Sequence, residues 1–199
     1  MTGFFKGIAT AMITPFDENG VNLEEFGKMI EYQIEGGTDA LVILGTTGEP
    51  ATMTETEKEQ VITYSVKKAA GRIKIIVGTG SNDTAKAVAS SVRAEKLGAD
   101  GILAVTPYYN KCTQKGLYDY YKDICDAVKI PVIAYNVPSR TAVNILPETA
   151  EKIAEIPNMA GIKEASGNMA QVCETMRRIR GKMDLYSGED FLNLPMLAI

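Results

Sequence analysis

Short apolar segments alternate with longer amphipathic segments at nearly even intervals along the chain. Each apolar segment has the length and composition of a strand that is buried on both faces. The pattern predicts seven strands, at Gly7–Thr14, Ala40–Gly45, Lys74–Gly78, Gly101–Thr106, Val132–Asn136, Ala160–Lys163 and Asp184–Ser187.

The amphipathic segments between these strands predict helices. Thr54 followed by Glu57 is a capping-box pattern, and Pro147 suits the first turn of a helix. Glycines at positions 36, 37, 71, 98 and 181 stand where helix C-terminal caps are expected. The predicted helices lie around Leu23–Glu35, Glu55–Ala70, Thr84–Leu97, Gln114–Val128, Pro147–Ile156 and Met169–Arg180.

Strict alternation of strands and helices predicts an α/β fold with parallel strands and right-handed crossovers. An open doubly wound sheet would accommodate it, but no G-x-G-x-x-G motif follows the first strand. Unusual polar residues instead follow several different strands, as in the active sites of barrels. We therefore predict a single domain with the fold of a (β/α)8 TIM barrel.

The pattern stops at about seven βα units. Leu194–Ile199 is expected to lie in the seventh helix, whereas a complete barrel typically needs about 250 residues. We therefore expect residues 1–199 to be a barrel domain truncated before the eighth strand and a C-terminal helical region. A deliberately shortened protein is the alternative. In either case two sheet edges would lack partners, so we expect the isolated chain to aggregate or pack loosely and to be inactive.

Composition excludes several classes of function. The 199 residues carry a net charge of −4 without a long basic cluster, so we expect neither nucleic acid nor membrane as a partner. Histidine is absent, which removes His-activated nucleophiles and imidazole metal ligands. Three widely spaced cysteines, Cys112, Cys125 and Cys173, fit neither a zinc site nor a disulfide framework. We expect a cytoplasmic protein with reduced thiols and no bound metal.

Lys163 is the first candidate catalytic residue. It closes an apolar strand and is followed by Glu164-Ala165-Ser166-Gly167, which has the composition of a turn. An amine placed at a strand end and removed from water has a lowered pKa and can attack a carbonyl carbon to form a Schiff base. A single lysine in such a position is more often merely solvated, so the other strand ends decide between the two interpretations.

Four other strand ends carry polar residues of the required kinds. Each has an ordinary interpretation when taken alone: a threonine-rich turn, packed tyrosines, or a core tyrosine beside a surface arginine. Together they could supply an anion-binding turn, hydroxyl proton carriers, a carboxylate-binding arginine and a glycine that lets backbone approach a ligand. The segments are Gly45–Glu49, Thr106–Asn110, Tyr135–Arg140 and Tyr186–Asp190.

The motifs GTTGE, TPYYNK, YNVPSRT, GIKEASG and LYSGED occur in this order at the strand ends. In these motifs the chain, from Gly7 to its last residue, resembles the dihydrodipicolinate synthase family of pyruvate-dependent class I aldolase-type lyases. The resemblance implies condensation of pyruvate with aspartate semialdehyde in lysine and diaminopimelate biosynthesis. It also implies a dimer of dimers, and no cofactor other than the covalent imine between Lys163 and pyruvate.

The resemblance also assigns roles to individual residues. Lys163 would form the imine, and Tyr135 would transfer protons during imine formation, addition and ring closure. Thr46 would link Tyr135 to Tyr109 of a neighbouring subunit. The remaining assigned residues would bind substrate: Thr47 the pyruvate carboxylate, Arg140 the carboxylate of aspartate semialdehyde, and Gly188 the wall of the pyruvate site.

Two alternatives remain open from the sequence. Another pyruvate-dependent lyase, acting on N-acetylneuraminate or a keto-deoxy sugar acid, would share the lysine and tyrosine, although Arg140 and the Tyr108-Tyr109 pair argue against it. A non-catalytic barrel fragment is the second alternative. Within the family, some members bind lysine as an inhibitor between subunits. Lys86 stands where an acidic partner for that effector is expected, so we expect weak or absent lysine feedback.

Overall fold

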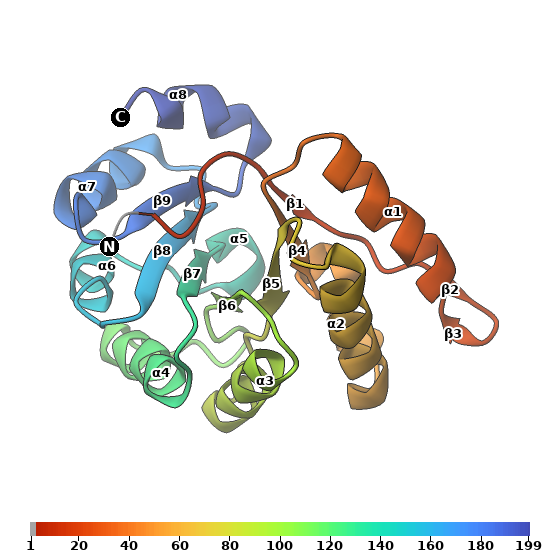
Figure 1. Ribbon diagram of the computed structural model, residues 1–199. Coiled ribbons are helices and arrows are strands. Elements are labelled where there is room, and N and C mark those ends of the chain that lie inside the picture. Colours follow the sequence, from red (N-terminus) through yellow and green to blue (C-terminus); the bar gives the residue numbers. More distant parts are fainter. Residues whose placement is uncertain (1–2) are drawn as a thin grey trace.

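The computed structural model describes residues 3–199 and shows a parallel sheet flanked by helices (Figure 1). The strands of the sheet alternate with helices along the chain, as the sequence predicts. These strands are β1 (Ala9–Ala11), β4 (Ala40–Ile43), β5 (Lys74–Gly78), β6 (Gly101–Val105), β7 (Val132–Asn136), β8 (Met159–Glu164) and β9 (Asp184–Ser187). The long helices are α1 (Leu23–Glu35), α2 (Glu55–Ala69), α3 (Thr84–Lys96), α4 (Gln114–Ala127), α6 (Pro147–Ile153) and α7 (Met169–Ile179).

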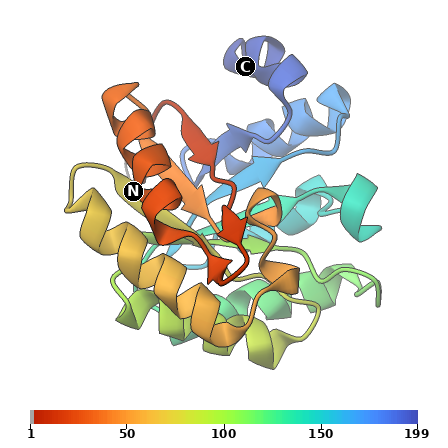
Figure 2. The same ribbon diagram turned by 90° about the vertical axis from the view of Figure 1, so that its right-hand side faces the viewer.

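The seven strands pair in chain order, β1-β4-β5-β6-β7-β8-β9, and every pairing is parallel. The sheet curls so that the helices lie on its outer side, which the turned view also shows (Figures 1 and 2). The predicted α/β barrel architecture is confirmed to this extent, with β1 and β9 at the two edges of the described sheet.

The predicted helix ends agree with the structure where capping residues define them. The side chains of Thr54 and Glu57 form the complete capping box at the start of α2. Pro147 is the first residue of α6. The glycine pair after α1 also lies where predicted: Gly36 is the C-cap, and Gly37 next to it carries the positive φ of 77°.

The first predicted strand was too long. The strand β1 is only Ala9–Ala11, although Gly7–Thr14 forms one apolar run. Ile8 and Ile13 are exposed, because β1 is an edge strand and neither side chain meets a second layer. The seventh strand and the following helix lie where predicted, and the helix is α8 (Asn193–Leu197).

Several short elements were not predicted, because each has too few residues to show a hydrophobic period. The strands β2 (Phe16–Asp17) and β3 (Gly20–Val21) form a two-stranded hairpin beside α1. The other short elements are η1 (Thr46–Gly48), η2 (Pro50–Thr52), α5 (Pro138–Thr141) and η3 (Asp190–Leu192). Three of them, η1, α5 and η3, follow strands directly and so lie at the carboxyl end of the sheet.

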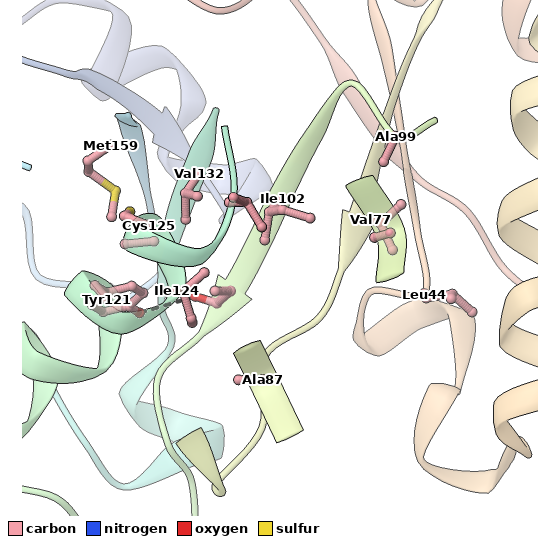
Figure 3. Close-up of a cluster of buried hydrophobic side chains, with 14 of the residues drawn as sticks. Leu44, Val77, Ala87, Ala99, Ile102, Tyr121, Ile124, Cys125, Val132 and Met159 are labelled. Atoms are coloured by element: carbon pink, nitrogen blue, oxygen red, sulfur yellow. Dashed lines mark hydrogen bonds between the residues drawn. The ribbon is translucent and has the colours of Figure 1, made fainter. Parts of the chain in front are cut away.

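The main hydrophobic core fills the layer between the sheet and the helices (Figure 3). In this layer Ile102 and Val132 on the strands meet Tyr121 and Ile124 on α4. A second, smaller cluster lies inside the curl of the sheet and includes Ile76, Leu103, Ile133 and Tyr135. Alternate residues of each strand therefore face two different cores, which makes the inner face available for a site at its upper rim.

The amino end of the sheet is covered by the segment that precedes β1. The Phe5 ring stacks on Tyr186 of β9 with a centroid distance of 4.5 Å. The Phe4 ring lies against Gly101, where an added Cβ would come within 2.7 Å of it. The Tyr186 hydroxyl donates to the Phe5 carbonyl at 3.1 Å. The segment thus contacts β6 and β9 and packs against the inner core.

Candidate active site

The carboxyl ends of the strands border one open cavity of about 2560 Å³. Residues from all five predicted strand ends line it, and so do residues 79–82, which follow β5. All seven predicted site residues are among them: Thr46, Thr47, Tyr109, Tyr135, Arg140, Lys163 and Gly188.

Lys163 is held at the rim by its position on β8. It is paired in register with Tyr135 of β7 on one side and Tyr186 of β9 on the other. The three side chains face the interior, because the alternate residue Ile162 packs in the outer core. The Lys163 Nζ atom lies 4.4 Å from the centroid of the Tyr135 ring. An amine and a phenol therefore share the inner face of the barrel.

Gly188 shapes the position of the lysine. A Cβ at this residue would come within 2.9 Å of Lys163 Cε and 3.0 Å of Ala165 Cβ. The Gly188 amide donates to the Glu164 carbonyl at 2.8 Å, so the backbone cannot move away without losing this bond. Only glycine lets the chain pass this close to the stem of Lys163.

The environment changes the proton affinity of both groups. Burial lowers the pKa of the Lys163 amine, and the carboxylates of Asp190 and Glu189 act against that shift. Burial raises the pKa of the Tyr135 phenol, Arg140 opposes this shift, and Glu189 adds to it. A lysine with a lowered pKa has a larger fraction of neutral amine, which is the nucleophilic form.

Thr46 and Thr47 open the one-turn helix η1 directly after β4. Leu44 before the turn and Glu49 after it both have positive φ, 52° and 55°. A hydrogen bond holds the turn in place: Thr14 Oγ1 donates to the Gly48 carbonyl at 2.8 Å. This bent backbone leaves both threonines at the cavity surface, where their hydroxyl and amide groups can meet a small anion.

Arg140 lies on the short helix α5 and is exposed at the mouth of the cavity. The loop after it turns sharply at Ala142, which has a φ of 57°. Thr141 is buried and fastens this turn, since its hydroxyl donates to the carbonyls of Val137 and Val143. The hydrogen-bonded turn therefore holds the segment that bears Arg140, and the positive guanidinium lies at the mouth of the cavity.

Tyr109 is the predicted site residue that extends furthest from the protein. Its side chain is 89% exposed and its φ is 73°. Asn110 next to it fastens the loop by donating from Nδ2 to the Asn82 carbonyl at 3.1 Å. Within residues 3–199 the structure describes no hydrogen bond among the hydroxyls of Thr46, Tyr109 and Tyr135, so their relay stays a prediction.

Four residues near the site were not singled out from the sequence. Glu189 and Asp190 belong to the motif LYSGED, but nothing in the motif shows that their charges reach Lys163. Asn136 and Glu164 are each one residue away from Tyr135 and Lys163, and both are buried. Successive side chains of a strand point to opposite faces of the sheet. This alternation could have predicted that Asn136 and Glu164 lie together on the face opposite Tyr135 and Lys163.

Among residues 3–199, no group of three or more His, Cys, Asp and Glu side chains could hold a metal ion. In the same part of the chain, no helix has both the length and the apolar character needed to cross a membrane. The predicted site residues that line the cavity supply an amine, phenols, hydroxyls and a guanidinium, and Asp190 adds a carboxylate.

Comparison with known proteins gives one consistent result. The sequence profile of the Dihydrodipicolinate synthetase family matches residues 4–199. The chain is 52% identical over 194 residues to a 4-hydroxy-tetrahydrodipicolinate synthase of Alkaliphilus oremlandii, covering 98% of this chain and 67% of that protein. It is 49% identical over 195 residues to 4-hydroxy-tetrahydrodipicolinate synthase 1 of Clostridium acetobutylicum, again with 98% and 67% covered.

The fold matches solved structures equally well. The chain superposes on dihydrodipicolinate synthase from Aquifex aeolicus with a TM-score of 0.95 and 48% sequence identity, covering 98% of this chain and 67% of that one. The chain therefore spans about two thirds of the length of these relatives.

Proposed function

The chain belongs to the dihydrodipicolinate synthetase family, and from this premise we propose that it carries the site of a 4-hydroxy-tetrahydrodipicolinate synthase. The reaction is the condensation of pyruvate with L-aspartate 4-semialdehyde, the first committed step of lysine and diaminopimelate biosynthesis. The enzyme class is a lyase, with Lys163 as the nucleophile and no organic cofactor or metal.

In the first half of the proposed reaction, the neutral Lys163 amine attacks the keto carbon of pyruvate and water leaves. Thr47 and the turn amides hold the pyruvate carboxylate, while Gly188 leaves space beside the new bond. The protonated imine then withdraws electrons, so a methyl proton leaves and an enamine forms. Tyr135 lies next to the nitrogen and is placed to transfer the protons of these steps.

In the second half, the enamine carbon adds to the aldehyde carbon of aspartate semialdehyde. Arg140 binds the carboxylate of this second substrate at the cavity mouth. The substrate amine then attacks the imine carbon, which closes the ring and returns Lys163 to its free form. Histidine is not needed, because tyrosine and water can carry every proton.

One observation carries this proposal: the Lys163 amine lies 4.4 Å from the Tyr135 ring, on the inner face of the barrel, with a pKa lowered by burial. Borohydride reduction in the presence of pyruvate should therefore fix a lactyl-sized mass on the peptide that contains Lys163. Lys152 and Lys182 serve as internal controls: Lys152 is exposed on α6, and the Lys182 amine lies within 4 Å of Glu151 and Glu155. An adduct on either control peptide instead of Lys163 would contradict the assignment.

A related pyruvate lyase acting on a sugar acid is the nearest rival. Turnover assays with aspartate semialdehyde and with N-acetylneuraminate distinguish the two, and we expect activity with the aldehyde alone. A non-catalytic barrel would show neither turnover nor a borohydride adduct, which separates that alternative from both enzymes.

The assembly we propose is a homo-oligomer, a dimer of dimers, in which Tyr109 enters the neighbouring active site. The support is the exposure of Tyr109 at the tip of a fastened loop. Its hydroxyl would meet Thr46 of the neighbour and extend the relay to Tyr135. We also propose the cytoplasm as the compartment, because Cys112, Cys125 and Cys173 all carry free thiols.

A further inference from the structure

A buried polar pair lies directly behind the catalytic pair. Tyr135 and Lys163 are register partners on the inner face, and the next residues, Asn136 and Glu164, are register partners on the outer face. Asn136 is fully buried and Glu164 is 1% exposed. Asn136 Nδ2 donates to both Glu164 oxygens, at 3.0 and 3.2 Å, and the Ser166 amide donates to Glu164 Oε1 at 2.7 Å.

The same asparagine closes the loop that carries Arg140. Asn136 Oδ1 accepts from the Ile145 amide at 2.9 Å, and its Nδ2 donates to Asn144 Oδ1 at 2.9 Å. Arg140 lies midway between the two ends that these bonds bring together. The Arg140 loop, residues 136–145, is thus held at its base by one buried side chain that also contacts the neighbour of Lys163 on β8.

A second amide pair anchors this base to the helices. Asn144 Nδ2 donates to Gln171 Oε1 at 2.8 Å, and Gln171 Nε2 donates back to Asn144 Oδ1 at 3.0 Å. Gln171 belongs to α7, the helix that follows β8. On the other side, Gln114 of α4 donates to the Asn144 carbonyl at 2.8 Å. The base of the loop is therefore fixed by β7, β8, α4 and α7 together.

We propose that Asn136, Glu164, Asn144 and Gln171 are positioning residues that set where Arg140 stands relative to Lys163, and so determine binding of the second substrate's carboxylate. The inference rests on the proposed function, because it needs a nucleophile at Lys163 and an anionic partner at Arg140. Amide and carboxylate groups have directional hydrogen bonds, so they fix the register of a loop in a way that apolar packing does not.

We expect a weaker loop base to affect binding of aspartate semialdehyde and not of pyruvate. Pyruvate meets Lys163 and Thr47, which lie on β8 and after β4, outside the Arg140 loop. Loosening the base of the loop should therefore leave imine formation intact and weaken binding of aspartate semialdehyde. A bidentate contact between arginine and carboxylate loses strength quickly when its orientation drifts.

The test uses Asn144→Ala and Gln171→Ala in the protein that carries this chain. We expect the KM for aspartate semialdehyde to rise about tenfold in each, while the KM for pyruvate and the rate of borohydride trapping change less than about twofold. The effect of the double variant should be smaller than the sum of the two single effects, because Asn144 and Gln171 share one pair of hydrogen bonds, although Asn144 also accepts from Asn136.

Asn158→Ala is the matched control. Asn158 is also half-buried, and its Nδ2 donates to the carbonyls of Cys125, Val128 and Ile130, but it lies at the amino end of β8. It should lower thermal stability by an amount similar to that of Asn144→Ala without changing the KM for aspartate semialdehyde. An equal rise of this KM in the control, or an unchanged KM in both loop variants, would overturn the positioning role.

If Asn144→Ala does not fold, Gln171→Met carries the test, because Gln171 is half-buried on a helix and Met keeps its volume. Failure of the inference is distinguishable from failure of the proposed function. Loss of the pyruvate adduct from the unmodified protein contradicts the function itself. A normal adduct with an unchanged KM contradicts only the role of the loop base.

Discussion

The two ends of the same sheet are built for different purposes. At the carboxyl end, strands stop in threonine, tyrosine and lysine around an open cavity. At the amino end, Phe4, Phe5 and the ring of Tyr186 cover the inner core. The strand β9 takes part in both, since the Tyr186 ring stacks on Phe5 while the Tyr186 backbone pairs in register with Lys163.

This difference predicts which substitutions should change the chemistry and which should change the stability of the fold. The amine, hydroxyl and guanidinium groups at the carboxyl end take part in the proposed reaction, so changing them should alter chemistry more than stability. Residues at the amino end have no part in the proposed reaction, so changing them should alter stability more than chemistry. Barrel enzymes in general show this division between the two faces of the sheet.

The largest expected effect is that of Tyr135→Phe at the carboxyl end. The change removes one hydroxyl and keeps the ring that packs beside Lys163. Loss of a positioned proton carrier should lower kcat by about 10²-fold or more, which corresponds to about 2.7 kcal/mol in the barrier. Steady-state kinetics would measure it, with a thermal melt as the control. Near-normal turnover with an unchanged melting temperature would remove the proposed role.

Phe5→Ala tests the opposite end. The substitution deletes the ring that stacks on Tyr186, so we expect the free energy of unfolding to fall by about 2 kcal/mol. The Lys163 adduct with pyruvate should form at its normal rate below the new melting temperature. Denaturant unfolding and borohydride trapping measure the two quantities separately. If folded Phe5→Ala no longer formed the pyruvate adduct, the two ends of the sheet would be coupled. The separation of stability from chemistry would then be wrong.

A smaller effect is expected for the carboxylates beside the lysine. Asp190 and Glu189 raise the pKa of Lys163 against the lowering caused by burial. Replacing Asp190 by Asn should therefore lower this pKa, increase the neutral amine at a given pH, and move the pH profile of pyruvate trapping downward. Glu24→Gln, on the exposed face of α1, is the control, and an upward shift for Asp190→Asn would contradict the assigned sign.

The smallest expected effect is that of added lysine. Lys86 is exposed at the cavity edge, and Glu55 nearby is already paired with Lys58 at 2.8 Å and with Arg93. An effector that carries an ammonium group would meet cations there, so we expect little inhibition. Initial rates with increasing lysine measure this, and Lys86→Glu should increase the sensitivity. Half-inhibition of the unmodified protein by sub-millimolar lysine would show the expectation to be wrong.

Most of the fold followed from the sequence because long periodic segments specify their own element. Leu23–Glu35 begins and ends where its amphipathic pattern does. The apolar run Gly7–Thr14 was misleading, because a run of hydrophobic residues does not show which of them will find a second layer to cover them. The short elements depend on tight local turns, such as the left-handed residues Leu44 and Glu49 around η1, which leave little trace in hydrophobicity.

The candidate site was predictable in its strand-end residues and less so in their partners. Lys163 and Tyr135 could be placed on facing strand ends because a parallel sheet brings such ends together. The nearness of Asp190 to Lys163 could not, because it depends on how η3 folds back over the cavity. The period of two could have placed Asn136 and Glu164 together. The bond from Asn136 to Asn144, and the pair that Asn144 forms with Gln171, depend instead on the path of a loop and a helix.

The contact between Phe5 and Tyr186 has a consequence for the order of folding. The hydrogen bond from the Tyr186 hydroxyl to the Phe5 carbonyl spans 181 positions of sequence, so its formation requires closure of almost the whole described chain. During synthesis the segment around Phe5 leaves the ribosome before β9, so this contact forms only after β9 has been made. Neighbouring βα units can pair early through short loops, whereas this closure comes late and slows the final step. The aromatic cover at the amino end is thus a feature that only the completed sheet can acquire.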